Sequence, residues 1–220
     1  MMRIILKCFI ALTLWIAGTA VRAALTNNMF NIRHIGYAEG LSSQRVFSIV
    51  EDIHGAMWIA TKTGIDRYNG HIIKSYTLPG NFYYGDLAGR KLGLLYHEKY
   101  GLWAYDHTGR VYHYSIENDC FEQYLYLGEF ITGEIILNKL YLDHEGTFWF
   151  GLNKGLYKND ADNNVIPVVQ QKYVNDIVVV EKTLFIGTST GVLQLSYSNL
   201  DKPRQLLGGH DVQTLFCDTT

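Results

Sequence analysis

The stretch GAMWIATKTGIDRYNG, Gly55–Gly70, predicts a β-hairpin. An aromatic and aliphatic core lies between two polar turns, and Gly64 follows Trp58 by six residues. The first strand is AMWIAT and the second is IDRYNG, joined by a turn at Lys62 and Thr63. If other parts of the chain repeat this hairpin, the repeat determines the architecture and limits the function.

The segments on either side of the hairpin predict two more strands. RVFSIVED (45–52) alternates its side chains as a strand with two differently packed faces does. Asp52 and Gly55 then bracket a tight turn, because a short Asp side chain bonds to nearby backbone amides and Gly tolerates positive φ. HIIKSYTL (71–78) follows the hairpin. The unit is therefore four short strands in a row.

An aromatic residue with a glycine six positions later occurs four times in the chain. The successive aromatic residues are 45, 46 and 36 positions apart. In each copy an apolar residue follows the glycine directly or one place later. Fixed spacings of this size indicate a repeat architecture. The four pairs are Trp58 with Gly64, Trp103 with Gly109, Trp149 with Gly155, and Phe185 with Gly191.

Four short antiparallel strands per ~45 residues are typical of a β-propeller blade. Counterparts of the fourth strand occur in CFEQYLYL (120–127) and VIPVVQQ (165–171). We therefore predict an all-β chain, a β-propeller built of about four four-stranded antiparallel blades. A β-sandwich is the alternative fold, but it does not require Trp and Gly at a fixed offset in every unit.

The composition fits a globular chain that has no nucleic-acid partner. Of the 220 residues 48% are hydrophobic, enough to bury a core. The net charge is -2 and no Lys/Arg cluster is present, which argues against binding to nucleic acid. Tyr is frequent, and its flat ring packs well on a pleated sheet.

The first 23 residues, MMRIILKCFIALTLWIAGTAVRA, have the three-part layout of a secretory signal peptide. Arg3 and Lys7 precede an apolar run, Cys8–Ala17, and small residues lead to Ala23. An N-terminal membrane anchor is the alternative, but the apolar run is about half of the ~20 residues that a spanning helix needs. We expect cleavage after Ala23 and export of the mature chain.

The segment EGLSSQRVFSIVEDIHGAMWIATKTGIDRYNG, Glu39–Gly70, resembles the two-component-regulator propeller repeat. That repeat opens with Gly-Leu-Ser, reaches Asp-x-x-Gly after a strand, and continues with Trp-Ile-Gly-Thr and Gly-Leu-x-Arg-Tyr. Here Ala60 replaces the expected Gly. FWFGLNKGLYK (148–158) and LFIGTSTGVLQL (184–195) fit more loosely, and GLWAYDHTGRVYHY (101–114) departs between its Trp and its Gly.

The resemblance, which extends from about Phe30 to the C-terminus, implies a sensory function. In that family the propeller is the periplasmic input module of membrane-bound sensors, often hybrid histidine kinases or diguanylate cyclases. Its loops recognise an extracytoplasmic cue, frequently an oligosaccharide. No phospho-acceptor helix, nucleotide-binding motif or helix-turn-helix is visible in this sequence, so the output belongs to the remainder of a longer receptor chain or to a partner.

We therefore predict a non-catalytic periplasmic sensory and ligand-binding propeller. The alternative is an extracytoplasmic propeller enzyme, a lyase or a glycoside hydrolase. An enzyme of this kind needs paired carboxylates or a His/Glu set near the central channel. The acidic residues of this sequence fall mostly in turns or stand alone on strands, which weakens that alternative.

The best candidates for ligand contact lie outside the repeat pattern, in GNFYYGD between the first and second units. Tyr83 and Tyr84 could stack on a sugar ring, while Asn81 or Asp86 could bind its hydroxyls. The alternative is a loop packed on its own blade. The repeated aromatic residues are expected to pack within blades, because they recur at one fixed position of a strand.

No metal, cofactor or catalytic site is predicted. The eight histidines are scattered, and no pair has metal-ligand spacing with a third partner. NDADNN (159–164) is similar to a calcium loop but lacks its central Gly and terminal Glu. Arg67 and Tyr68 belong to the repeat motif and are expected to pack between strands. Two cysteines of the mature chain, Cys120 and Cys217, leave one disulfide bridge open.

The repeat boundaries predict units near 30–79, 80–128, 129–171 and 172–208, with the start of a further unit at 209–220. MFNIRHIGYAEGLS (29–42) matches the fourth strand of a blade, although no first three strands precede it. HDVQTLFCDTT (210–220) matches the first strand, QRVFSIVEDIH (44–54). These two ends predict an incomplete propeller. Because an open arc exposes a strand edge and an apolar blade face, we expect self-association.

Overall fold

A computed structural model describes residues 32–80 and 91–218 of the chain. The predicted signal peptide, 1–23, lies outside the described residues. One compact unit extends from Ile35 to Thr220, and all that follows concerns this unit.

The described residues of this unit form four antiparallel sheets, each of four consecutive strands. Blade 1 contains β1 (Val46–Glu51), β2 (Met57–Thr61), β3 (Ile65–Tyr68) and β4 (Ile73–Tyr76). Blade 2 contains β5 (Leu92–His97), β6 (Gly101–Asp106), β7 (Arg110–Ser115) and β8 (Cys120–Tyr126). Blade 3 contains β9 (Leu137–Leu142), β10 (Phe148–Leu152), β11 (Gly155–Asn159) and β12 (Val165–Gln170). Blade 4 contains β13 (Val174–Val180), β14 (Thr183–Thr188), β15 (Gly191–Ser196) and β16 (Asn199–Gly208).

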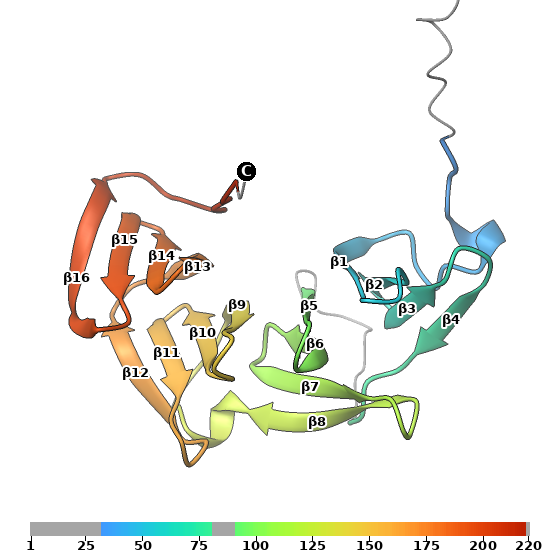
Figure 1. Ribbon diagram of the computed structural model, residues 1–220, viewed down its shortest axis with the longest axis horizontal. Helices are drawn as coiled ribbons and strands as arrows, with labels where there is room; N and C mark the ends of the chain where they lie inside the picture. The colour runs from blue at the N-terminus through green and yellow to red at the C-terminus, as the bar shows by residue number, and fades with distance from the viewer. Residues whose placement is uncertain (1–31, 81–90, 219–220) are drawn as a thin grey trace, which may run out of the picture. The chain divides into compact units, whose positions relative to one another are not determined.

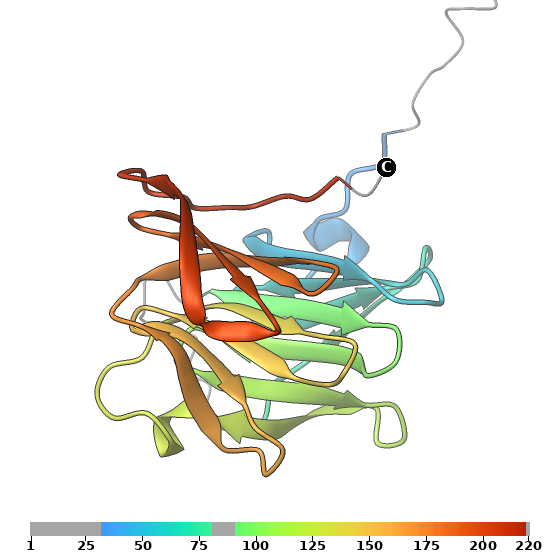
Figure 2. The ribbon, with the colours of Figure 1, turned by 60° about the vertical axis from the view of Figure 1, so that its left-hand side comes forward.

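The blades follow one another in chain order, with the first strand of each blade innermost (Figure 1). The inner strand β1 contacts β5, β5 contacts β9, and β9 contacts β13. Blade 4 does not reach blade 1, so the ring is not closed (Figure 1). Figure 2 shows the four sheets stacked beside one another when the unit is turned. The predicted fold, an incomplete propeller of four-stranded antiparallel blades, is confirmed.

The hydrophobic core consists of three clusters, and each one spans two consecutive blades. Trp58 and Ile65 of blade 1 meet Tyr112 and Phe121 of blade 2. The second cluster joins blades 2 and 3, and the third joins blades 3 and 4. Because the middle blades have a neighbour on each side, their second strands are buried almost throughout: Phe148–Leu152 contains no exposed residue. Apolar burial of this kind is the main stabilising term of a repeat fold.

The four repeated aromatic residues occupy the second strand of their blades. Trp58 pairs with Arg67 of β3, Trp149 with Lys158 of β11, and Phe185 with Gln194 of β15. Each of these pairs is nine residues apart, so the two-residue turn between the second and third strands is the same in blades 1, 3 and 4.

A buried aspartate holds the indole in two of the blades. Trp58 Nε1 donates to Asp52 Oδ2 at 2.8 Å, and Trp149 Nε1 donates to Asp143 Oδ2 at 3.0 Å. The other carboxylate oxygen of each Asp accepts two backbone amides of the turn that follows, at 2.9–3.0 Å. One side chain thus closes the turn and fixes the Trp on the next strand.

The glycines that follow the aromatic residues do not all have the same role. Gly64, Gly155 and Gly191 have φ of 153°, 145° and 136°, and a Cβ there would lie 1.8–2.5 Å from a backbone oxygen of the fourth strand. Only Gly permits that approach. Gly109 instead lies in a longer turn, because in blade 2 the anchor Trp103 pairs with His113, ten residues later.

The N-terminal described residues differ from the prediction. In the segment 29–42, expected to form a fourth strand, residues 29–31 are not described. The rest contains no strand and has a 3-10 turn at Tyr37–Glu39. A fourth strand is stable only when it pairs with a third, and residues 32–42 have no such partner within the described chain.

The C-terminal segment, residues 209–218, packs on blade 4 as β13 packs on blade 3. A Cβ added at Gly151 of β10 would meet Val174 at 2.8 Å and Ile177 at 3.3 Å. A Cβ added at Gly187, the equivalent residue of β14, would meet Val212 at 3.1 Å and Leu215 at 3.4 Å. Val212 and Leu215 therefore occupy the places that Val174 and Ile177 hold one blade earlier.

Candidate functional site

The ligand residues predicted from the sequence, Asn81, Tyr83, Tyr84 and Asp86, lie outside the described residues. Their role stays a prediction. Lys91, the first described residue after that segment, lines a hollow at the inner ends of the blades.

This inner hollow has a volume of about 990 Å³. It lies where the inner strands β1, β5, β9 and β13 begin, and the C-terminal segment also contributes to it. Turns between the second and third strands contribute His107 and Ser189. Concave sites where several elements converge are the usual places for ligand binding, so the inner hollow is the candidate functional site.

Irregularities in three inner strands turn particular side chains into the hollow. The pairing of β1 with β2 shifts between Val46 and Ser48, which leaves Phe47 as an extra residue. The same shift leaves Asn138 unpaired in β9 and Asn175 unpaired in β13. All three residues line the hollow. A β-bulge redirects a side chain in this way and is common beside functional sites.

The two asparagines link each blade to the strand that follows it. Asn138 Nδ2 donates to the carbonyl oxygen of Val174 at 2.8 Å. Asn175 Nδ2 donates to the carbonyl oxygen of Val212 at 2.9 Å and to Asp211 Oδ1 at 3.0 Å. Gln213 Nε2 donates to the other oxygen of Asp211 at 2.7 Å. The Asp211 carboxylate therefore has an amide donor on each oxygen.

An ion pair supports the hollow from behind. Lys139 of β9 lies 2.8 Å from Asp176 of β13, whose side chain is almost fully buried. The second oxygen of Asp176 accepts the backbone N–H of Leu215 at 2.9 Å. Burial raises the pKa of the neighbouring Tyr105 to about 12, so this residue stays a neutral phenol. A charged pair satisfied on both oxygens holds the C-terminal segment against blade 4.

Arg67 and Tyr68 of the repeat motif make contacts within blade 1. The Arg67 guanidinium lies 5.2 Å above the Trp58 ring and 3.8 Å from Asp52. Tyr68 donates to the carbonyl oxygen of Gly70 at 2.7 Å. Burial raises the pKa of Asp52, but hydrogen bonds from Trp58 and two backbone amides, with the Arg67 charge, outweigh it and hold the pKa below its ordinary value.

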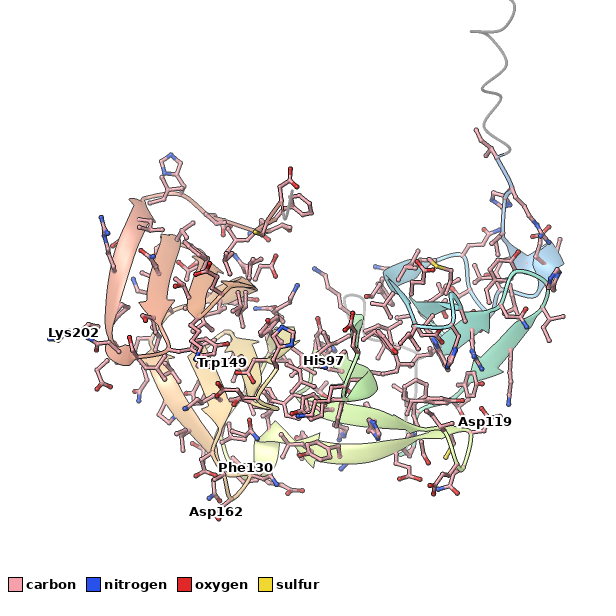
Figure 3. All side chains as sticks on the ribbon, in the orientation of Figure 1. His97, Asp119, Phe130, Trp149, Asp162 and Lys202 are labelled. Carbon is pink, nitrogen blue, oxygen red and sulfur yellow. The ribbon has the colours of Figure 1, made fainter. Side chains whose placement is uncertain are left out.

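Two histidines meet where blades 2 and 3 contact each other. The rings of His97 and His144 have centroids 5.3 Å apart, and Tyr100 lies 4.9 Å from His97 (Figure 3). Burial lowers the pKa of His97, and a charge on His144 lowers it further. Glu98 and Asp143 act in the opposite direction.

Over residues 32–80 and 91–218, no group of three His, Cys, Asp or Glu side chains has the geometry to hold a metal ion. Cys120 and Cys217 are both free thiols. No helix of the described chain is long and apolar enough to cross a membrane.

Sequence reasoning missed Asn138, Asn175 and Gln213. Their signal lies in the repeat alignment, where each follows the first apolar residue of an inner strand: Leu137, Val174 and Val212. Blade 1 has Phe47 at this place, so packing alone does not require an amide. The irregular pairing that exposes these side chains could not be predicted from the alternation of apolar residues.

Comparison with solved structures gives similar folds. The extracellular domain assigned to the hybrid two component system BT3049 from B. thetaiotaomicron is 20% identical, with a TM-score of 0.64 over 85% of this chain and 28% of that one. A second such domain, assigned to the one component system BT4673, is 21% identical, with a TM-score of 0.63 over 80% and 26%. This chain therefore spans little more than a quarter of each.

An enzyme is also among the similar structures. Virginiamycin B lyase from Staphylococcus aureus is 14% identical, with a TM-score of 0.55 over 73% of this chain and 55% of that one. At these identities the likeness establishes the fold alone. No curated protein matches the sequence. A family model described as "Two component regulator propeller" matches residues 40–63. The chain is thus a β-propeller arc that carries a two-component-regulator propeller repeat.

Proposed function

We propose that this chain is the periplasmic, non-catalytic input region of a signalling receptor and that it binds an extracytoplasmic ligand, with an oligosaccharide as the first candidate. The observation that carries the proposal is the inner hollow, which gathers hydrogen-bonding side chains from blades 3 and 4 and the C-terminal segment. Support comes from the family repeat at 40–63 and from the fold shared with extracellular domains assigned to signalling systems.

The chemistry of the hollow favours binding over catalysis. Of the carboxylates that line it, Asp211 already accepts two amide hydrogen bonds. A general acid or base must exchange a proton with the substrate, and a carboxylate held between two amides is a poor one. Amides and a few aromatic side chains instead resemble the lining of sites that orient a ligand without reacting with it.

A thermal-shift screen of the purified protein against plant and host oligosaccharides tests the proposal. A specific ligand should raise Tm in proportion to the logarithm of its concentration, as mass action requires. Mass spectrometry of the same samples should recover the ligand unchanged. Cleavage or elimination of the ligand would support the propeller enzyme instead, and the absence of any stabilising ligand would count against the sensor.

A further inference from the structure

We infer that the inner hollow is a binding site for a neutral, polyhydroxylated ligand, such as an uncharged oligosaccharide, held by the side-chain amides of Asn138, Asn175 and Gln213. The inference rests on the proposed function and adds to it the place of the site and the charge of the ligand.

The first step concerns the bulge position. In blade 1 the same irregularity places Phe47 at the hollow, so the backbone accepts an apolar residue there. In blades 3 and 4 the extra residue is Asn, a polar group on the inner surface of the propeller. A polar side chain that the fold does not require there points to an interaction with something in the hollow.

The second step concerns the orientation of the two amides. Each Nδ2 is bonded to the backbone of the next inner strand, which fixes the plane of the amide. Over residues 32–80 and 91–218, no hydrogen bond reaches the Oδ1 of Asn138 or the Oδ1 of Asn175. A fixed amide oxygen with both lone pairs available is an acceptor that needs a donor such as a hydroxyl group.

The third step concerns charge. The ionic side chains at the hollow are Lys91, Glu134 and Asp211, and the last has amide partners on both oxygens. An anionic ligand would face two carboxylates with one lysine to offset them, so the site favours a ligand without charge. Tyr173 at the edge of the hollow is 38% exposed, and its ring offers the flat apolar surface on which sugar rings stack.

The fourth step concerns the consequence of binding. Asn175 belongs to β13, while Gln213 belongs to the C-terminal segment. A ligand that bonds to both would hold this segment against blade 4, in addition to the bond from Leu215 to Asp176. Binding in the hollow would thus stabilise the path of the chain beyond blade 4, which is a physical route for a signal.

Isothermal titration of the purified protein tests the inference with xylotetraose and maltotetraose as neutral probes and tetragalacturonate as an anionic probe. The variants Asn138→Leu and Asn175→Leu keep the side-chain size and remove the acceptors. Tyr173→Ala changes the edge of the hollow without touching either amide link. Gln123→Leu removes an exposed amide from the outermost strand of blade 2 and is the matched control.

We expect one neutral probe to bind, each Asn variant to weaken that binding about tenfold, and Gln123→Leu to leave it unchanged. Tyr173→Ala should also weaken it and serves as the deciding variant if an Asn variant does not fold. Equal affinity in all folded variants would overturn the inference but leave the proposed function intact. Binding of tetragalacturonate alone would overturn the assignment of a neutral ligand. If another class of ligand binds while all three saccharides fail, the inference is wrong and the proposed function survives.

Discussion

The substitution Trp149→Phe should destabilise the fold more than Trp103→Phe, although both residues hold the same position in their blades. Trp149 is 2% exposed, and its N–H donates to a buried Asp143 that is 5% exposed. Loss of a hydrogen bond to a charged group costs about 1.5–3 kcal/mol, and the smaller ring adds about 1 kcal/mol. Trp103 donates to the neutral carbonyl oxygen of Tyr100, a bond worth about 0.5–1.5 kcal/mol.

Urea denaturation of the two variants measures this difference in the free energy of unfolding, which we expect to be about 1–2 kcal/mol. A double-mutant cycle with Asp143→Asn isolates the bond, and the two substitutions should not be additive. Phe185 occupies the same position in blade 4, and the residue six places before it is Val179, not Asp. Equal losses at Trp149 and Trp103, or additivity with Asp143→Asn, would show that the aspartate does not anchor the blade.

Three further predictions concern pH, association and export. Because burial lowers the pKa of His97 in the folded state, the stability due to this residue should be complete above pH 6.5 and should fall as the pH drops below it; Tm measured from pH 8 to pH 5 should decline less in His97→Gln. Val46 and Ile49 of β1 are 40% and 52% exposed, whereas the matching residues of blades 3 and 4 are buried, so sedimentation should show oligomers that Ile49→Lys reduces; a stable monomer would refute this. Mass spectrometry of the exported protein should find Ala24 at its N-terminus, and retention of the first residues would contradict the signal peptide.

The fold could be predicted from the sequence because its turns and its core use the same residues in each unit. Asp52 and Asp143 each accept bonds from the turn and from the following Trp, so one short motif specifies both local and tertiary structure. Such agreement between levels makes a repeat recognisable even when few residues are shared. The spacing of Trp103 and Gly109 was less informative, because the turn of blade 2 is one residue longer than the others.

The candidate site could be predicted only in part. Its amides reach the hollow through irregular strand pairing, and a bulge leaves no periodic signal in a single sequence. The loop at 80–86 was chosen for its aromatic residues, and its role stays a prediction. The strand expected at 29–42 illustrates the opposite problem, since a β-strand pattern forms a strand only where a neighbour offers its backbone.

A crystal structure of the purified protein, grown with the neutral saccharide that binds most tightly, tests the central claim most directly. The account predicts that the four units superimpose with Trp58, Trp103, Trp149 and Phe185 on their second strands, and that the saccharide lies against Asn138 in the inner hollow. An aromatic anchor on a different strand in any unit would contradict the fold. A saccharide bound away from the inner strands would contradict the site.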